Sequence, residues 1–161
     1  MKSNLKIKKI APVYIHRNVF NEIKSLSKNS ENEIFGYLVG LILNWKHEKY
    51  IVIKDQIHLK DSIISEKYIT SALEGSAGDY VREYNKLKAK DENLYIVGWW
   101  HTHINLGCFL SPIDIRSQEM GFPEPYQVAL VVDPIRDEYK FFTLDLKSES
   151  KYKTITNIII D

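Results

Sequence analysis

The residues that decide the fold begin with Leu94-Tyr-Ile-Val-Gly-Trp-Trp100, continue through His101-Thr-His103 and reach Ser111-Pro-Ile-Asp114. The first run predicts a buried strand because it is short and almost wholly apolar. Side chains at positions i and i+2 of an extended chain point the same way, so both imidazoles reach toward one point. The last run is typical of a helix start, with Ser at the N-cap, Pro at the first helical position and an acid two residues later. The stretch therefore predicts a strand, a loop and a helix that carry two histidines and a carboxylate.

The rest of the chain alternates strand and helix patterns. We expect Asn18 to cap the first helix, and a polar turn over Asn44–His47 to join two strands as a hairpin. The apolar stripe of the second helix consists of Leu73, Ala77, Tyr80, Val81, Tyr84 and Leu87. The predicted strands are Ile10–Ile15, Glu33–Leu43, Glu48–Leu59, Leu94–Trp100, Tyr126–Val132, Glu138–Leu144 and Thr154–Ile160, and the predicted helices are Asn18–Lys28, Leu73–Leu87 and one that begins at Ser111.

The composition bounds the protein class. Strands in adjacent runs with a few helices between them predict an α+β domain, and without a linker or repeat we expect one domain over residues 1–161. A net charge of +1 gives no reason to expect a nucleic-acid partner. The apolar runs are too short to cross a membrane, and the basic start lacks the apolar run of a signal peptide, so we expect none there. The single cysteine, Cys108, cannot form an internal disulfide, which favours a reducing compartment and hence the cytoplasm.

Two histidines alone bind a metal weakly, so a third ligand is needed, and Asp114 follows His103 by eleven residues. Two His and one carboxylate form a three-ligand zinc set with an open position for water, as in catalytic sites. Such a site lowers the pKa of the water to roughly 7. Ser111 can then donate to an oxyanion, and Glu33, an acid that opens an apolar strand, is the candidate general base if burial raises its pKa. Taken singly, these residues also fit surface histidines, a helix cap and an exposed strand end.

The motifs around these residues resemble those of the JAMM (MPN+) metalloproteases. The similar segments are Glu33-Ile-Phe-Gly-Tyr-Leu-Val-Gly40, Val97-Gly-Trp-Trp-His-Thr-His103, Gly107-Cys-Phe-Leu-Ser111 and Val131-Val-Asp-Pro134, within a likeness that spans about Ile10 to Leu144. The resemblance implies the MPN fold, a curved, mostly antiparallel sheet with helices packed on it. It implies one zinc ion per chain, bound by His101, His103 and Asp114. It further implies that Glu33 polarises the attacking water, and that Ser111 steadies the tetrahedral intermediate.

By the same resemblance, the expected reaction is hydrolysis of an isopeptide or peptide bond at the C-terminus of a ubiquitin-like protein. Two alternatives stay open: a zinc amidohydrolase that processes a sulfur-carrier tail or small amino-acid conjugates, and a non-catalytic MPN scaffold. Three positions depart from the family pattern, namely Thr102 between the histidines, Ile104 after them and Pro112 after the serine.

Several other side chains have a simple structural interpretation. We expect His16, His47 and His58 to lie at the surface. Cys108 fits a small packing residue better than a redox switch or a fourth ligand. The consecutive Trp99 and Trp100 point to opposite faces of their strand, so we expect one in the core and the other toward the cleft or a partner.

Overall fold

The computed structural model describes residues 11–60 and 77–161. The predicted start of the second helix, Leu73, lies outside this part of the chain. Most predicted elements lie within two or three residues of their expected positions. In chain order, the described elements are β1 (Val13–Ile15), α1 (Arg17–Lys28), β2 (Phe35–Trp45), β3 (Glu48–His58), α3 (Ala77–Lys90), β4 (Tyr95–Thr102), α4 (Pro112–Gly121), β5 (Val128–Asp133), β6 (Glu138–Leu144), β7 (Tyr152–Ile155) and β8 (Ile158–Ile160).

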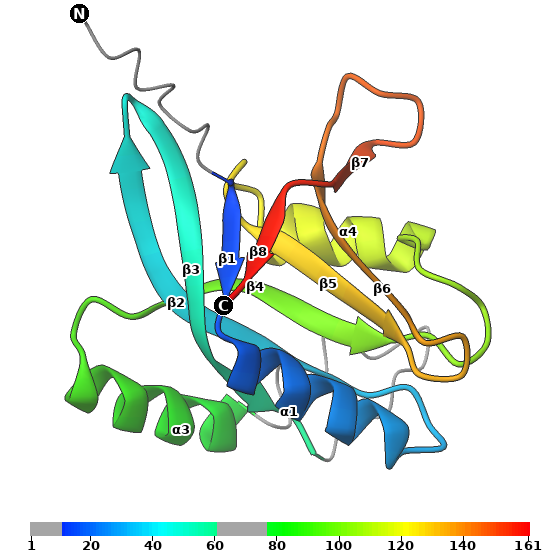
Figure 1. Ribbon diagram of the computed structural model, residues 1–161, viewed down its shortest axis with the longest axis horizontal. Helices are drawn as coiled ribbons and strands as arrows, with labels where there is room; N and C mark the ends of the chain where they lie inside the picture. The colour runs from blue at the N-terminus through cyan, green and yellow to red at the C-terminus, as the bar shows by residue number, and fades with distance from the viewer. Residues whose placement is uncertain (1–10, 61–76) are drawn as a thin grey trace, which may run out of the picture.

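All described strands belong to one sheet with the order β7-β6-β5-β4-β2-β3-β1-β8. Four of its seven pairings are antiparallel and three are parallel, which confirms the expected α+β class and mostly antiparallel sheet. Strand β4, which leads into the predicted ligands, lies near the middle, between β2 and β5. Figure 1 shows this sheet with α1 and α3 in front of or beside it and α4 behind.

The prediction of one final strand over Thr154–Ile160 is wrong. The structure has two strands there, β7 at one edge of the sheet and β8 at the other, and only Thr156 and Asn157 separate them. Successive Cα atoms are about 3.8 Å apart, so this link spans at most about 11 Å. The sheet therefore curls until its two edges approach each other, and the chain crosses from one edge to the other at this point.

The hairpin of β2 and β3 forms as expected. Lys46 and His47 occupy its turn with φ angles of 47° and 71°, the left-handed conformation that two-residue hairpin turns favour. Farther along β2, Gly36 lies where a side chain would collide with the carbonyl oxygen of Ile57 and with the indole nitrogen of Trp100. A glycine at this position lets the indole ring lie directly against the β2 backbone.

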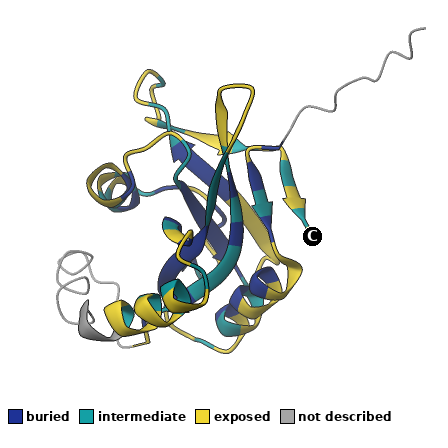
Figure 2. Cartoon of the chain, turned by 90° about the vertical axis from the view of Figure 1, so that its left-hand side faces the viewer, coloured by how far each residue is buried: buried dark blue, intermediate teal, exposed yellow. Residues whose placement is uncertain are grey.

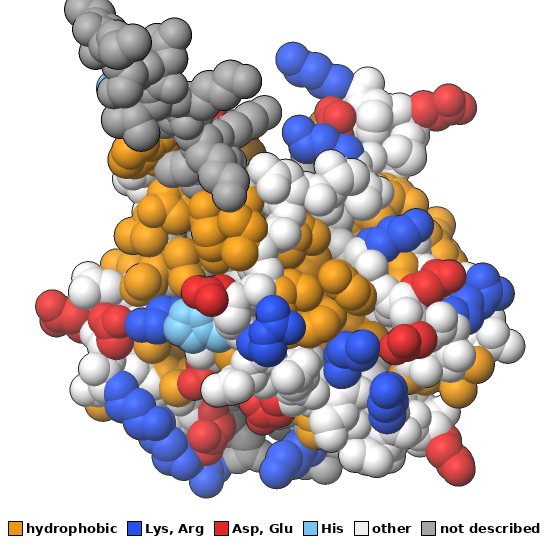
Figure 3. All heavy atoms as spheres, in the orientation of Figure 1, with side chains coloured by type: hydrophobic (Ala, Val, Ile, Leu, Met, Phe, Trp, Pro, Cys, Tyr) orange, Lys and Arg blue, Asp and Glu red, His pale blue; other side chains and the backbone are white. Residues whose placement is uncertain are grey.

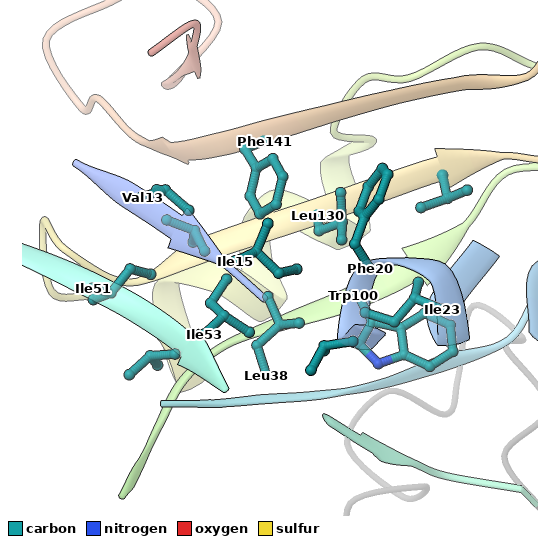
Figure 4. Close-up of a cluster of buried hydrophobic side chains, with 14 residues drawn as sticks. Val13, Ile15, Phe20, Ile23, Leu38, Ile51, Ile53, Trp100, Leu130 and Phe141 are labelled. Atoms are coloured by element: carbon teal, nitrogen blue, oxygen red, sulfur yellow. The ribbon is translucent and has the colours of Figure 1, made fainter. Parts of the chain in front are cut away.

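The concave side of the sheet encloses an apolar core that α1 covers. Phe20 and Ile23 of α1 point toward Trp100 and Leu130 of the sheet (Figure 4). The predicted N-cap at Asn18 is wrong, because α1 starts at Arg17 with His16 as its N-cap. That start is fixed by backbone pairing at the end of β1: the His16 N–H donates to the Ile53 carbonyl and the Arg17 N–H to that of Asp161.

A second apolar layer lies on the other face of the sheet, beneath α3 and α4. Tyr80, Tyr84 and Leu87 pack against it, as the stripe predicts, and the Tyr84 hydroxyl donates to the Leu94 carbonyl at 3.2 Å. Val81 is exposed, so its place in the stripe is wrong: α3 packs along a narrower face than the pattern indicates. Figure 2 shows the buried residues gathered in the central strands and on the inner sides of the helices.

The surface carries both signs of charge. On the face in Figure 3, Lys and Arg side chains are interspersed with Asp and Glu, in keeping with the net charge of +1. Over residues 11–60 and 77–161, no helix combines the length and the apolar character that crossing a membrane requires.

Candidate metal centre

The two histidines lie where β4 ends. The strand runs two residues beyond the predicted Trp100, so His101 is still paired in the sheet, opposite Phe35 of β2 and Val131 of β5. His103 follows directly, and its N–H donates to the Val132 carbonyl at 3.0 Å. Because both residues are held by backbone pairing, their imidazole rings lie on the same face of the sheet.

Asp114 reaches this point from the first turn of α4. Ser111 is the N-cap, as predicted: its Oγ accepts the Asp114 N–H at 3.2 Å, and Asp114 Oδ2 accepts the Ser111 N–H at 2.8 Å. This reciprocal capping box fixes the carboxylate at the helix N-terminus. The same Oδ2 lies 3.3 Å from His101 Nε2 and 3.5 Å from His103 Nε2.

The three side chains form a compact buried group. One donor atom from each of His101, His103 and Asp114 lies within 4.8 Å of the others. Burial alone would raise the pKa of Asp114, but the two histidines and the Ser111 N–H lower it well below the usual value. Burial likewise opposes the charged form of His103, yet Asp114, the Gly107 carbonyl and Glu33 together raise its pKa.

The chemistry of these donors fits a single zinc ion. Both ring nitrogens of His101 are shielded from solvent and have no hydrogen-bond partner among the described residues. A buried polar atom without a hydrogen-bond partner costs free energy, and an ion held between His101 Nε2 and Asp114 Oδ2, 3.3 Å apart, would remove that cost. The ring nitrogens of His58 are also unpartnered, but His58 lies outside the group of possible ligands. Two imidazole nitrogens and one ionised carboxylate oxygen are a donor set typical of catalytic zinc.

Each histidine ring is held by a second contact. Trp99 stacks on His101 with ring centroids 4.3 Å apart and planes inclined by 15°. The Trp99 indole N–H donates to Gln118 Oε1 at 2.6 Å, so α4 in turn holds the indole. His103 Nδ1 lies 2.9 Å from the Gly107 carbonyl oxygen. Since a carbonyl only accepts, Nδ1 carries the proton in the neutral ring, which leaves Nε2 free toward Asp114.

Glu33 lies beside this group and outside it. The structure places it two residues before β2, half-buried, so the predictions that it opens the strand and lies in the interior are wrong. The neighbouring Ile34 exchanges two hydrogen bonds of 2.9 Å with Thr102, which ties this segment to the end of β4. Glu33 is near enough for its charge to raise the pKa of His103.

Ser111 lies at the rim of the same group and is half-buried. Its hydroxyl oxygen accepts the Asp114 N–H, which uses a lone pair and leaves the hydroxyl proton for another acceptor. The helix cap and the oxyanion donor are therefore compatible roles for one side chain.

The sequence predicts no role for two buried residues near the site, Gln118 and Asp133. Gln118 is fully buried, and besides accepting from Trp99 it donates to the Phe122 carbonyl at 3.1 Å. Its spacing of four residues from Asp114 puts both on one face of α4, which is the signal that identifies it. Asp133 is also fully buried, and its signal is a lone acid after the apolar run of β5.

The remaining histidines and the cysteine lie outside the metal group. His16 and His47 are exposed, as expected, but the prediction for His58 is wrong. Its ring is half-buried beside Trp100, with centroids 5.7 Å apart, and burial, followed by the charge of Lys60, lowers its pKa. Cys108 is buried, and its pKa is raised to about 11 chiefly by burial. Its thiol points to the Val131 carbonyl at 3.4 Å, as a packing residue does.

With the geometry in place, the comparisons with known proteins identify the family. The family described as "JAB1/Mov34/MPN/PAD-1 ubiquitin protease" matches residues 8–121, more than half of the chain and the whole segment from Glu33 to Asp114. The chain belongs to this family. The JAB1/MPN family assignment agrees with the resemblance seen in the motifs.

Relatives within the JAB1/MPN family include subunits of the COP9 signalosome. COP9 signalosome complex subunit 5 of Eremothecium gossypii is 34% identical over 103 residues, which cover 63% of this chain and 23% of that protein. The same subunit of Debaryomyces hansenii is 33% identical over 111 residues, covering 66% and 22%. The chain thus aligns with less than a quarter of the length of these relatives.

A solved structure supports the fold. Protein DSY2949 from Desulfitobacterium hafniense, determined in solution, superposes with a TM-score of 0.60 over 92% of both chains at 16% identity. At that identity the likeness concerns the fold alone. Together with the family match, it shows that the curved sheet with its packed helices is the MPN fold.

Proposed function

We propose that this JAB1/MPN-family protein is a zinc-dependent protease that hydrolyses an isopeptide or peptide bond at the C-terminus of a ubiquitin-like protein. The observation that carries the proposal is the convergence of His101 Nε2, His103 Nε2 and Asp114 Oδ2, buried and within 4.8 Å of one another, beside Glu33. These three atoms would hold one Zn²⁺ per chain and leave its fourth position open to substrate or water.

The position of each side chain indicates its role in the proposed reaction. Bound zinc supplies Lewis acidity, which lowers the pKa of a coordinated water to about 7 and polarises the scissile carbonyl. Glu33, outside the metal group but electrostatically coupled to His103, takes the proton of the water and passes it to the leaving amine. The Ser111 hydroxyl donates to the oxygen on which negative charge develops. The two histidines and the Ser111 N–H lower the pKa of Asp114, which favours the ionised carboxylate that a metal ligand must be.

The substrate class rests on the family and its relatives. The family description names a ubiquitin protease, and the relatives are subunits of one complex. A ubiquitin-like protein or its conjugate is therefore the proposed partner, and residues 1–161 are the proposed single catalytic domain. A buried, unpaired thiol at Cys108 is compatible with the proposed cytoplasmic location.

The test compares the wild type with Glu33→Gln and with Glu31→Gln, a matched control two residues upstream whose side chain is exposed. Each protein is assayed for zinc content and for cleavage of a panel of ubiquitin-like C-terminal conjugates, with and without a chelator. We expect Glu33→Gln to keep one zinc per chain and lose about 10²- to 10⁴-fold in kcat, the usual contribution of general base catalysis. Glu31→Gln should match the wild type.

The alternative functions correspond to distinct results. Hydrolysis of small amino-acid conjugates or a sulfur-carrier tail, but of no ubiquitin-like conjugate, would indicate the broader amidohydrolase. Zinc-loaded protein that cleaves neither the ubiquitin-like conjugates nor the smaller substrates would indicate the scaffold. Glu33→Gln with near-normal turnover would contradict the role of Glu33 as the base.

A further inference from the structure

Asp133 is a buried carboxylate that the proposed mechanism does not use. It ends β5, after five apolar residues, and none of its surface is exposed. A carboxylate in such a place needs several donors to offset its lost hydration. Its donors are backbone N–H groups from two segments that are distant in sequence, Asn105 and Gly107 from the loop after His103, and Ile135 and Arg136 from the turn after β5.

The two oxygens of Asp133 accept different N–H groups. Oδ1 accepts the N–H groups of Asn105, Ile135 and Arg136 at 3.1 to 3.2 Å. Oδ2 accepts the Gly107 N–H at 2.7 Å, the shortest of the four bonds. The Arg136 guanidinium holds the same loop from outside, through bonds of 3.2 and 3.3 Å to the carbonyl and side-chain oxygens of Asn105.

The Gly107 bond leads to the metal centre. Gly107 has a φ of +82°, a conformation that glycine adopts without strain, and its carbonyl oxygen lies 2.9 Å from His103 Nδ1. The residue that Asp133 holds by its N–H therefore holds His103 by its carbonyl. On the other side of the ring, Nε2 faces Asp114 Oδ2.

We propose that Asp133 is a positioning residue for His103: through Gly107 it fixes the ring orientation of His103 and keeps its proton on Nδ1. The proposal rests on the metal site of the proposed function and adds a residue to it. Outer contacts of this kind orient a metal-binding histidine and commonly contribute 10- to 100-fold to metal affinity.

A substitution can separate this role from a general contribution to the fold. In Asp133→Asn one side-chain oxygen remains, and at Oδ1 it can still accept the bonds from Asn105, Ile135 and Arg136. The amide NH₂ then faces the Gly107 N–H, so two donors meet where a bond of 2.7 Å existed. Asp137→Asn is the matched control, because Asp137 lies in the same turn, is exposed, and pairs only with Lys24 at 3.3 Å among the described residues.

The experiment measures zinc affinity by chelator competition. NMR of metal-free protein then identifies the protonated nitrogen of His103 and gives the exchange rate of the Gly107 amide. We expect Asp133→Asn to weaken zinc binding by about 10- to 100-fold, with a mixture of His103 tautomers and faster exchange at Gly107. Asp137→Asn should stay within twofold of the wild type. A folded Asp133→Asn protein with wild-type zinc affinity and an unchanged His103 tautomer would overturn the proposal.

A second variant decides the matter if Asp133→Asn does not fold. Gly107→Ala leaves Asp133 intact but strains the loop, because its Cβ would lie 3.3 Å from Arg136 Nη1 at a φ of +82°. Weakened zinc binding and mixed tautomers support the proposal, and wild-type values overturn it. The NMR readout also separates the two hypotheses: a wild type that binds no zinc contradicts the proposed function, while the His103 tautomer in the variants still decides the role of Asp133.

Discussion

Each face of β4 carries a buried tryptophan, and the two rings have different surroundings. Trp99 and Trp100 are neighbours, both are buried, and each donates its indole N–H to a glutamine. The Trp100 ring lies in the apolar core beneath α1 (Figure 4). The Trp99 ring stacks on His101 and is held by Gln118 of α4.

The difference between these faces lies in their buried polar groups. On the Trp99 side, four polar residues are buried, namely His101, His103, Asp114 and Gln118. The ring nitrogens of His101 form no hydrogen bond with the described residues, although Nε2 lies 3.3 Å from Asp114 Oδ2. On the Trp100 side the core cluster is apolar, and the half-buried His58 ring beside Trp100 belongs to no group of possible metal ligands among the described residues. One strand thus supplies packing on one face and chemistry on the other, so substitutions on the two faces should change different quantities.

The largest expected effect is that of Asp114→Ala. It removes a proposed zinc ligand, so zinc affinity should fall by more than about 100-fold, the upper end for outer contacts. The bond from the Ser111 N–H to Asp114 Oδ2 would also be lost, at about 1 kcal/mol of stability, while the Ser111 cap on the N–H of residue 114 would remain. Asp114→Asn is the control, because its side-chain oxygen can still accept the Ser111 N–H. Titration with a competing chelator measures the zinc affinity of both variants. Full zinc occupancy in Asp114→Ala would contradict the assignment of Asp114 as a ligand.

Replacing each tryptophan by phenylalanine tests the contrast between the faces directly. Trp99→Phe leaves the buried Gln118 Oε1 without its donor, which should lower the free energy of unfolding by about 1–3 kcal/mol. Zinc affinity should also fall several-fold, because His101 loses part of its stacking partner. Trp100→Phe leaves a cavity and also removes the donor to Gln56 Oε1, at roughly 2 kcal/mol in total, less than the 3–5 kcal/mol of truncation to alanine. Its zinc affinity should not change. Urea unfolding of metal-free protein and zinc titration separate these outcomes, and equal zinc effects would break the contrast.

The smallest effect is expected at Cys108, which packs on the Trp99 side without joining the metal group. Burial raises its pKa to about 11, so only a minute thiolate fraction exists at pH 8. Native protein should react with iodoacetamide far more slowly than protein unfolded in urea, with or without zinc. Mass spectrometry of timed samples measures both rates, and rapid labelling of the native protein would show that the thiol is reactive after all.

Local patterns predict the local parts of the site. The i, i+2 spacing of His101 and His103 and the cap at Ser111 depend only on neighbouring residues, so the sequence predicts both, and α4 starts where expected. Glu33 is different, because Ile34 pairs with Thr102 across 68 positions and thereby sets where the strand begins. No local pattern contains that pairing.

The same reason explains the other differences. The isoleucine-rich C-terminal run indicates strand, but its division between β7 and β8 follows from how far the whole sheet curls. The N-cap of α1 is set by backbone contacts with Ile53 and Asp161. Asp133 and Gln118 are visible as polar residues among apolar ones, yet their partners come from other segments, so their roles appear only in three dimensions.

The curled sheet has a consequence for how the chain folds. β1 pairs on one side with β3 and on the other with β8, which follows every other described strand in the sequence. During synthesis β1, α1 and β3 emerge early, whereas the β8 edge of β1 stays open until residues 158–160 leave the ribosome. Pairings between strands so distant in sequence slow folding, because a long loop must close before any contact rewards it. The open edge of β1 is therefore the place where a nascent chain is most exposed to wrong strand pairing.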